Sequence, residues 1–528
     1  MTPLRRWLLP ALPLLFLAVV LVAPVWRLLA EGFSASTSEV RWAEVWTDDY
    51  LRWRVLWSFA QAAITCVLAL LLGLPCAWVL ARREFPGRAL ALRLLMLPFV
   101  VPTLVAAMGV LALWGPRGLL GAPLADAGIE LVDTPWLLLY GNLFFNLCLV
   151  VRAGVDALAQ VDAQRLDAAR TLGATPWRAF WRVEWPAIAP WLASALCLVF
   201  LYCFSGFGLA LILGGERYST AEVEIYTLVA HELELGRAGV LAVWMMALTG
   251  AVALAYAWLE RRLAAPSRVT PVLRQRPVRG GQWLAVGAAM TMLLVVCVAP
   301  LAAIVWRAAS VLLDGSGTAV LMADDTLLAL GNTLRFSLLA VVFATTLGLS
   351  HAFASQRSVG WRAMAFLPFV VSPVSVAFGL LLLYPDWSAS LAVLLSAYAL
   401  LAFPFVAKSV TAALDGLPAN YQQAAATLGA SPWRVFRRVT LRLIAPALRR
   451  GMAFAAATAL GEFAVTLFLS RPEWTTLTTL IHQHLGRPGA SQLDAAFVLA
   501  ALLMGLALLA FVLIEGRGNQ AGDNPHHA

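Results

Sequence analysis

The fold of this protein is decided by a polar segment that occurs twice. Residues 167–190 read DAARTLGATPWRAFWRVEWPAIAP, and residues 423–446 read QAAATLGASPWRVFRRVTLRLIAP. Fifteen of these 24 positions are identical at an offset of 256 residues. A second pair of similar stretches precedes them, LPFVVP at 97–102 and LPFVVSP at 367–373. Self-similarity of this kind indicates an internal duplication, so we expect two homologous halves.

The composition is that of a membrane protein. Of the 528 residues, 61% are apolar and only 13% are charged, and the mean hydropathy is +0.80. Soluble domains have about 45–50% apolar and about 25% charged residues, and one membrane-spanning helix needs roughly 20 apolar residues. The apolar runs are continuous, whereas the strands of a membrane β-barrel alternate apolar and polar residues. We therefore expect an all-α membrane protein and exclude a soluble enzyme.

The apolar runs predict twelve spans, six in each half. They lie near 7–30, 54–82, 91–114, 135–159, 191–214, 238–259, 283–308, 328–355, 362–384, 388–413, 447–470 and 493–516. The corresponding domain boundaries are 1–262 for the first half, 263–282 for a basic linker, 283–516 for the second half and 517–528 for a polar tail.

Arginines gather in alternate loops, which predicts the orientation of the chain. The basic segments hold Arg5 and Arg6; Arg82, Arg83 and Arg88; Arg165, Arg170, Arg178 and Arg182; Arg261, Arg262, Arg268, Arg274, Arg276 and Arg279; Arg357 and Arg362; Arg434, Arg437, Arg438 and Arg442; and Arg517. The opposite loops are rich in Asp and Glu. Because short cytoplasmic loops retain Lys and Arg, we expect both termini in the cytoplasm. The net charge of +9 then reflects loops at the lipid surface, not a nucleic acid partner.

The repeated segment has the pattern of a helix, a glycine turn and a second short helix. Gly173 supplies the stop, Thr175 is an N-cap candidate and Pro176 suits the first helical position. The second helix displays Trp177 and Arg178 in one half, and the other half displays Trp433 and Arg434. An amphipathic loop resting on lipid headgroups is the alternative interpretation. The duplication of the detailed pattern favours a docking element.

This loop resembles the E-A-A-x3-G-x9-I-x-L-P signature of the membrane subunits of binding-protein-dependent ABC importers. The matching residues are Asp167, Ala168, Ala169 and Gly173, and Gln423, Ala424, Ala425 and Gly429. The resemblance implies a type I importer permease fold whose loops dock two copies of an ABC ATPase subunit, which would bind the ATP and Mg, and a periplasmic solute-binding protein as a further partner. Two departures, neutral Gln423 and Arg442 in place of the final proline, put equal strength of the two docking contacts in doubt.

Within that family, the chain resembles the fused permeases of thiamine importers. It rests on EVWTDDYL at 44–51, RREFPGR at 82–88, NLFFNL at 142–147, RVEWP at 182–186, EIY at 224–226 and GEF at 461–463. Fused ferric-iron permeases share several of these stretches, so ferric iron is the alternative cargo. Both resemblances imply transport of a small solute into the cytoplasm across the inner membrane of a bacterium.

The chain has no sequence motif for ATP binding, cofactor binding or metal binding. A P-loop needs Gly-Lys-Ser/Thr, and the single lysine, Lys408, follows Ala407. We therefore expect no enzymatic activity in this chain. An ion-coupled secondary transporter is the alternative class, since repeated six-span halves also build those folds. It would favour several carboxylates or histidines inside the spans, and the spans have few.

Polar and aromatic residues inside the spans are the candidates for a substrate path, because such residues tend to face the interior of a helix bundle. They are Asn142, Asn146, Tyr202, Ser205, Phe207, Glu462 and Phe463. The alternative for most of them is a hydrogen bond to a neighbouring helix. Glu462 has Gly206 as its counterpart at the 256-residue offset, so this carboxylate exists in one half only. The acidic segment 216–237 either docks the binding protein or is an ordinary solvated loop.

Overall fold

The computed structural model describes residues 11–38, 42–263, 270, 272–356, 359–388, 390–469 and 471–515. These residues are almost entirely helical, and the sheet-like contact among them is an isolated parallel bridge between Arg83 and Gln275. The expected all-α fold is confirmed. Arg5 and Arg6, the tail 517–528 and linker residues 264–269 and 271 lie outside the described residues.

The chain forms two compact units, and their boundaries differ from the boundary between the two homologous halves of the sequence. The first unit comprises residues 35–99 and 103–310, and the second comprises 1–34, 100–102 and 311–528. The first span of each predicted half thus groups with the helices of the other half. Small residues permit this packing: a Cβ on Gly379 would lie 2.7 Å from the Pro24 carbonyl oxygen in the second unit, and one on Gly109 would lie 2.9 Å from that of Pro300 in the first.

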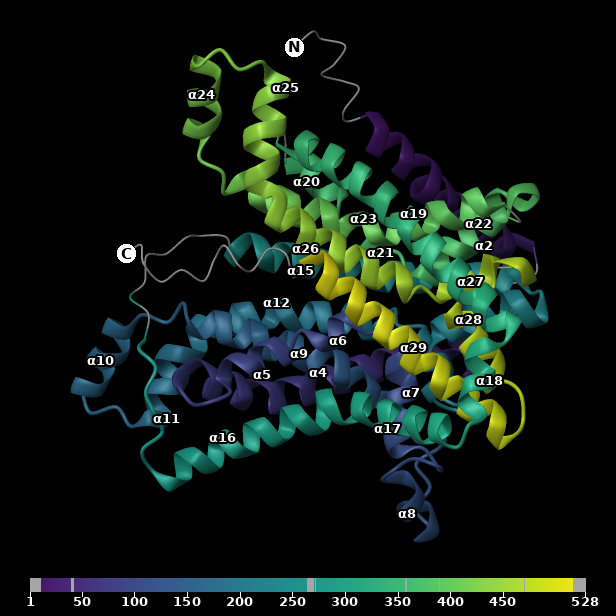
Figure 1. Cartoon of the computed structure of the whole chain (residues 1–528), viewed down its shortest axis with the longest axis horizontal. Helices are drawn as coiled ribbons and strands as arrows, with labels where there is room; N and C mark the ends of the chain where they lie inside the picture. Colours follow the sequence, from purple (N-terminus) through teal and green to yellow (C-terminus); the bar gives the residue numbers. More distant parts are fainter. Residues whose placement is uncertain are drawn as a thin grey trace. The chain divides into compact units, whose positions relative to one another are not determined.

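In the first unit, three long helices lie side by side (Figure 1), namely α4 (Asp49–Arg82), α9 (Pro135–Leu158) and α12 (Trp185–Phe204). The other helices of this unit are α3 (Glu44–Thr47), α5 (Arg88–Leu94), α6 (Leu97–Val100), α7 (Thr103–Trp114), α8 (Gly121–Asp126), α10 (Ala163–Thr171), α11 (Pro176–Ala179), η2 (Phe180–Glu184), α13 (Gly208–Leu213), α14 (Ala221–Thr227), η3 (Leu228–Glu232), α15 (Leu235–Leu263), α16 (Gly280–Leu293), η4 (Leu294–Val298) and α17 (Ala299–Leu313).

The second unit repeats this arrangement with α19 (Asp324–Ser355), α23 (Leu391–Asp415) and α26 (Leu441–Leu460) in mutual contact. Its other helices are η1 (Ala18–Val22), α2 (Ala23–Ser38), α18 (Ser316–Met322), α20 (Val359–Met364), α21 (Leu367–Val370), α22 (Pro373–Leu383), η5 (Pro385–Trp387), α24 (Ala419–Thr427), α25 (Pro432–Val435), η6 (Phe436–Thr440), α27 (Ala464–Leu469), η7 (Pro472–Trp474), α28 (Leu477–Leu485) and α29 (Ala490–Glu515).

The spans agree broadly with the twelve expected. Within the described residues, nine helices are long and apolar enough to cross a membrane, or ten if one bent pair counts as a span. The predicted span 91–114 is wrong as a single helix, because its parts Arg88–Val100 and Thr103–Trp114 meet at 111°. Pro102 explains the break, since proline lacks an amide donor and disfavours helical backbone at the residue before it.

Three more predicted spans are interrupted. The span near 362–384 is divided into α20, α21 and α22. The span near 191–214 ends as a long helix at Phe204, and the span near 447–470 ends as one at Leu460. Each of these two is followed by a three-residue gap and a six-residue helix, α13 or α27. Ser205-Gly206-Phe207 and Gly461-Glu462-Phe463 fill the gaps, so small residues stand at the same place in both repeats.

Candidate functional site

The first repeated loop has the local structure that its sequence predicts. Helix α10 ends at Thr171, and Gly173 follows in the left-handed conformation with φ +78°. The amide of Ala174 donates to the Ala169 carbonyl at 3.0 Å, which closes the helix end. Thr175 then caps α11, its hydroxyl accepting from the Arg178 amide at 3.4 Å.

The second loop has the same backbone geometry although nine of the 24 residues in the repeated segment differ. Gly429 has φ +77°, and the Ala430 amide donates to the Ala425 carbonyl at 3.1 Å. Ser431 occupies the N-cap position of α25 with extended backbone, and Pro432 takes the first helical position. The predicted helix and glycine turn are therefore confirmed in both halves, and a second helix begins shortly after each turn.

Both loops present the same side chains to the outside. Leu172 and Leu428 are each 88% exposed, and Trp177 and Trp433 are 70% and 67% exposed. The remaining predicted docking residues Asp167, Ala168, Arg178, Gln423, Ala424 and Arg434 are exposed, and Ala169 and Ala425 are half-buried. A short helix with exposed apolar and basic side chains suits insertion into a groove on a partner.

The second helix of each loop is not a separate element, contrary to the expectation. It continues without a break through a π-helical turn, η2 or η6, into α12 or α26. In Figure 1, α10 and α11 lie at one end of α12, and α24 and α25 lie at one end of α26. A force on either loop would therefore act directly on a long helix.

Asp167 has a partner within its own helix that the sequence analysis missed. Its carboxylate lies 3.1 Å from the Arg170 guanidinium, and both side chains are more than half exposed. The equivalent residues in the second loop, Gln423 and Ala426, cannot form this ion pair. The spacing of three residues between an acid and a base on a helix was the available signal.

The structure uses Asn142 and Asn146 to join helices within the first unit. The Asn142 side-chain amide donates to Gln61 Oε1 at 2.7 Å, and Gln61 Nε2 donates to the Cys203 carbonyl at 2.8 Å. Asn146 Nδ2 donates to Cys203 Sγ on α12 at 3.3 Å and to the Asn142 carbonyl of its own helix at 2.8 Å. All three amides are buried. These contacts support the helix-joining interpretation of both asparagines.

The other first-unit candidates are spread along the end of α12. Tyr202 is 45% exposed, and the Ser205 hydroxyl donates back to the Leu201 carbonyl at 2.7 Å. Phe207 is buried and packs edge-on against Tyr226, with ring centroids 5.6 Å apart. Of these residues, Tyr202 alone presents a large exposed surface.

Glu462 lies in the gap between α26 and α27 and is only 8% exposed. Its Oε1 accepts a hydrogen bond from the Val465 amide at 2.9 Å, so the carboxylate caps α27. The neighbouring Phe463 is buried and packs against the His482 ring at 5.4 Å. A structural role for Glu462 is thus present, and a role of its charge in transport stays a prediction.

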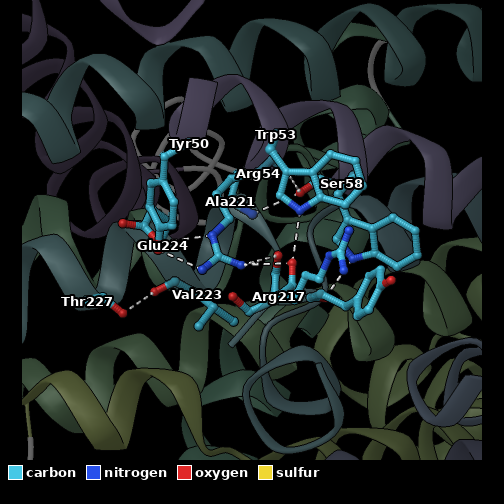
Figure 2. A network of polar contacts seen from close by, with 12 residues as sticks. Tyr50, Trp53, Arg54, Ser58, Arg217, Ala221, Val223, Glu224 and Thr227 are labelled. Carbon is cyan, nitrogen blue, oxygen red and sulfur yellow. Dashed lines mark hydrogen bonds and ion pairs between the residues drawn. The ribbon is translucent and has the colours of Figure 1, made fainter. Parts of the chain in front are cut away.

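A buried polar cluster that the sequence analysis missed ties α4 to α14 (Figure 2). Arg54 Nε lies 3.3 Å from Glu224 Oε2, and both side chains are at most 6% exposed. Tyr50 donates its hydroxyl proton to Glu224 at 2.8 Å, and Arg54 also donates to the Ser219 carbonyl at 3.3 Å. Burial raises the pKa of the Glu224 carboxyl, and the Tyr50 and Arg54 contacts offset part of that rise.

Helix α4 also supplies a hydroxyl, that of Ser58, which caps the start of α14. The Ala221 amide donates to Ser58 Oγ at 2.8 Å, and in the second unit the Leu477 amide donates to Thr333 Oγ1 at 2.9 Å. Ala221 and Leu477 are related by the 256-residue offset. Ser58 and Thr333 are 275 residues apart, as are the first residues of α4 and α19. The cap is therefore a feature of both repeats.

The ion pair, in contrast, occurs in one repeat only. The counterparts of Arg54 and Glu224 are Ala329 and Leu480. We expect Glu224→Leu to lower the free energy of unfolding by about 3 kcal/mol, because it leaves the Arg54 guanidinium buried without a carboxylate. The double variant Arg54→Ala/Glu224→Leu should lose less free energy of unfolding than the two single variants lose together. The difference is the coupling energy of the pair, which we expect to be about 1–3 kcal/mol.

Reversible unfolding in mixed detergent micelles measures these differences in a double-mutant cycle. Asp49→Asn, which breaks an exposed pair with Arg52 at 2.6 Å, is the matched control. It should change the free energy of unfolding by less than about 1 kcal/mol. Strictly additive effects of the Arg54 and Glu224 changes would contradict an energetic link between them.

The chain matches a family described as the inner membrane component of binding-protein-dependent transport systems. The match occurs twice, over residues 69–265 and 340–516. The chain therefore belongs to this family as a fused permease with two homologous halves, and it is a multi-pass protein of the inner membrane. The resemblance inferred from the repeated loop is confirmed.

Similar proteins support the fused arrangement over nearly the full length. The thiamine transport system permease protein of Escherichia coli strain K12 is 27% identical over 96% of each chain. That of Haemophilus influenzae is 27% identical over 90% of each chain. The sulfate transport system permease protein of Synechocystis is 31% identical but covers 40% of this chain and 76% of its own.

Proposed function

We propose that this permease carries thiamine from the periplasm to the cytoplasm by alternating access. Two ABC ATPase subunits bind at the two repeated loops, hydrolyse ATP there with Mg, and move α12 and α26 as they close and open. A periplasmic solute-binding protein delivers the cargo on the opposite side of the membrane. Both termini are cytoplasmic in this arrangement.

The matching geometry of the two exposed loops is the observation that carries the proposal. Two glycine turns with φ within 1° of each other, and two tryptophans of nearly equal exposure, suit two copies of one partner. The continuous helix from Pro176 to Phe204 offers a rigid link from one loop into its unit. The fused relatives that transport thiamine favour that cargo over ferric iron.

Reconstitution of the purified chain in proteoliposomes with the ATPase and binding protein of the same transport system tests this function. We expect uptake of labelled thiamine that requires internal ATP and both partner proteins. Uptake of ferric iron instead of thiamine would overturn the cargo, and uptake driven by an ion gradient without the ATPase would overturn the mechanism.

The two loops should differ in how their ATPase contacts respond to salt. Asp167→Asn should weaken ATPase binding about twofold to fivefold at low salt and have little effect at high salt, since exposed ion pairs contribute roughly 0.2–1 kcal/mol and are screened. Gln423→Ala should show no such salt dependence. Binding of the ATPase to the detergent-solubilised permease, measured over a salt series, distinguishes the two. Equal and salt-insensitive losses would contradict an electrostatic role for Asp167.

A further inference from the structure

A cavity of about 800 Å³ lies in the first unit where α4 meets the first repeated loop and the linker. Its lining follows α4 from Leu70 to Arg82 and continues to Arg83. At about 1.5 Å of rise per residue, this stretch is roughly 20 Å long. The cavity therefore extends from the apolar part of a span to its charged end.

The two ends of the cavity differ in chemistry. Leu70, Leu71 and Leu74 line it within the span, and Leu71 is 64% exposed. Arg83 and Gln275 line it beyond the span. The cavity thus has an apolar end lined by leucines and a polar end lined by an arginine and a glutamine. These two ends match the acyl chains and the headgroup of a phospholipid.

Four indoles also line the cavity, those of Trp78, Trp177, Trp181 and Trp185. The rings of Trp181 and Trp185 lie 5.3 Å apart. Their indole N–H groups donate no hydrogen bond to any residue that the structure describes. Tryptophan is enriched at the headgroup level of membranes, where its ring is apolar and its N–H is hydrated.

The charges around the cavity favour an anion. Arg82 and Glu184 neutralise each other through a buried contact of 2.6 Å. Arg170 is paired with Asp167 on the exposed side of α10. Arg83 stacks over Trp78 at 5.6 Å, and no carboxylate of the described chain lies within ion-pair distance of it. One uncompensated positive charge thus remains at the mouth.

We propose that this cavity binds an anionic phospholipid, with the headgroup phosphate at Arg83 and the acyl chains along Leu70, Leu71 and Leu74. The site belongs to the first repeat alone. At the 256-residue offset, Trp181 is replaced by Arg437, Glu184 by Thr440 and Trp185 by Leu441. The lipid would fill the space beside the first loop and hold α4, α11 and the linker together.

Native mass spectrometry of the full chain, titrated with phosphatidylglycerol or phosphatidylcholine, tests the proposal. We expect one phosphatidylglycerol to bind more tightly than phosphatidylcholine. Arg83→Gln should weaken it about fivefold, the factor that corresponds to about 1 kcal/mol for one arginine at an anionic lipid surface. Leu74→Trp, which fills the apolar end, should weaken both lipids. Arg93→Gln, at an exposed arginine of α5 outside the cavity lining, is the matched control and should change neither.

Three outcomes would overturn the proposal. Equal binding of the two lipids would remove the role of the charge. Displacement of phosphatidylglycerol by millimolar inorganic phosphate would identify a free-anion site. Complete loss of the lipid on addition of the ATPase subunits would show that a protein partner occupies the cavity.

Discussion

Gly173→Val and Gly429→Val are each expected to lower ATP-driven uptake at least tenfold. Both glycines have φ close to +78°, a conformation that costs an L residue about 1–2 kcal/mol and a β-branched residue more. The space around each is open, with no atom within 4 Å of an added Cβ, so the penalty is one of backbone conformation. A shift of about 1.4 kcal/mol changes an equilibrium tenfold, which is enough to misplace the second helix of the loop.

The measurement pairs uptake with ATP hydrolysis in the reconstituted system. A displaced loop should leave hydrolysis uncoupled from transport or prevent the ATPase from binding. Gly416→Val is the matched control, because Gly416 has φ −81° and its added Cβ would have no neighbour closer than 3.7 Å. Normal uptake together with normal ATPase binding in both loop variants would rule out the docking role.

The local features of the loops could be predicted from sequence because they depend on neighbouring residues. A glycine after a helical stretch, an N-cap hydroxyl and a proline at the first helical position each act within a few residues. The duplication supplied a second copy of the segment, in which the glycine, the N-cap hydroxyl and the proline recur. Other positions differ between the two copies, such as Asp167 and Gln423. The approximate positions of most spans followed from composition, although four of the twelve predicted spans are interrupted.

Features that depend on distant residues could not be predicted. Arg54 and Glu224 are 170 residues apart, and their pairing needs the packing of α4 against α14. The exchange of first spans rests on close approaches such as Pro24 to Gly379, which leave no pattern in either segment. The asparagines were ambiguous for the same reason, since their partner Gln61 lies on another helix. The break at Pro102 did have a local signal, the proline itself.

Glu462→Gln is expected to slow thiamine uptake about tenfold while leaving stability nearly unchanged. Glutamine keeps a side-chain oxygen that can accept from the Val465 amide, which the carboxylate does at 2.9 Å. It removes the negative charge that the carboxylate carries when it is ionised, however, and thiamine, the proposed cargo, carries a fixed positive charge. Two opposite charges about 4 Å apart attract by roughly 1–4 kcal/mol between bulk water and a protein surface, and 1.4 kcal/mol corresponds to about tenfold in rate.

Glu462→Ala separates the two roles of this residue, because it removes both the charge and the cap. We expect it to lower stability by about 1 kcal/mol in addition to slowing uptake, as the loss of a helix cap does. Glu473→Gln makes the same chemical change at an exposed carboxylate and should alter neither property. Thermal unfolding and initial uptake rates of the three variants give both readouts. Wild-type uptake by a well-folded Glu462→Gln variant would leave the cap as the whole function of this carboxylate, since uptake would then not depend on its charge.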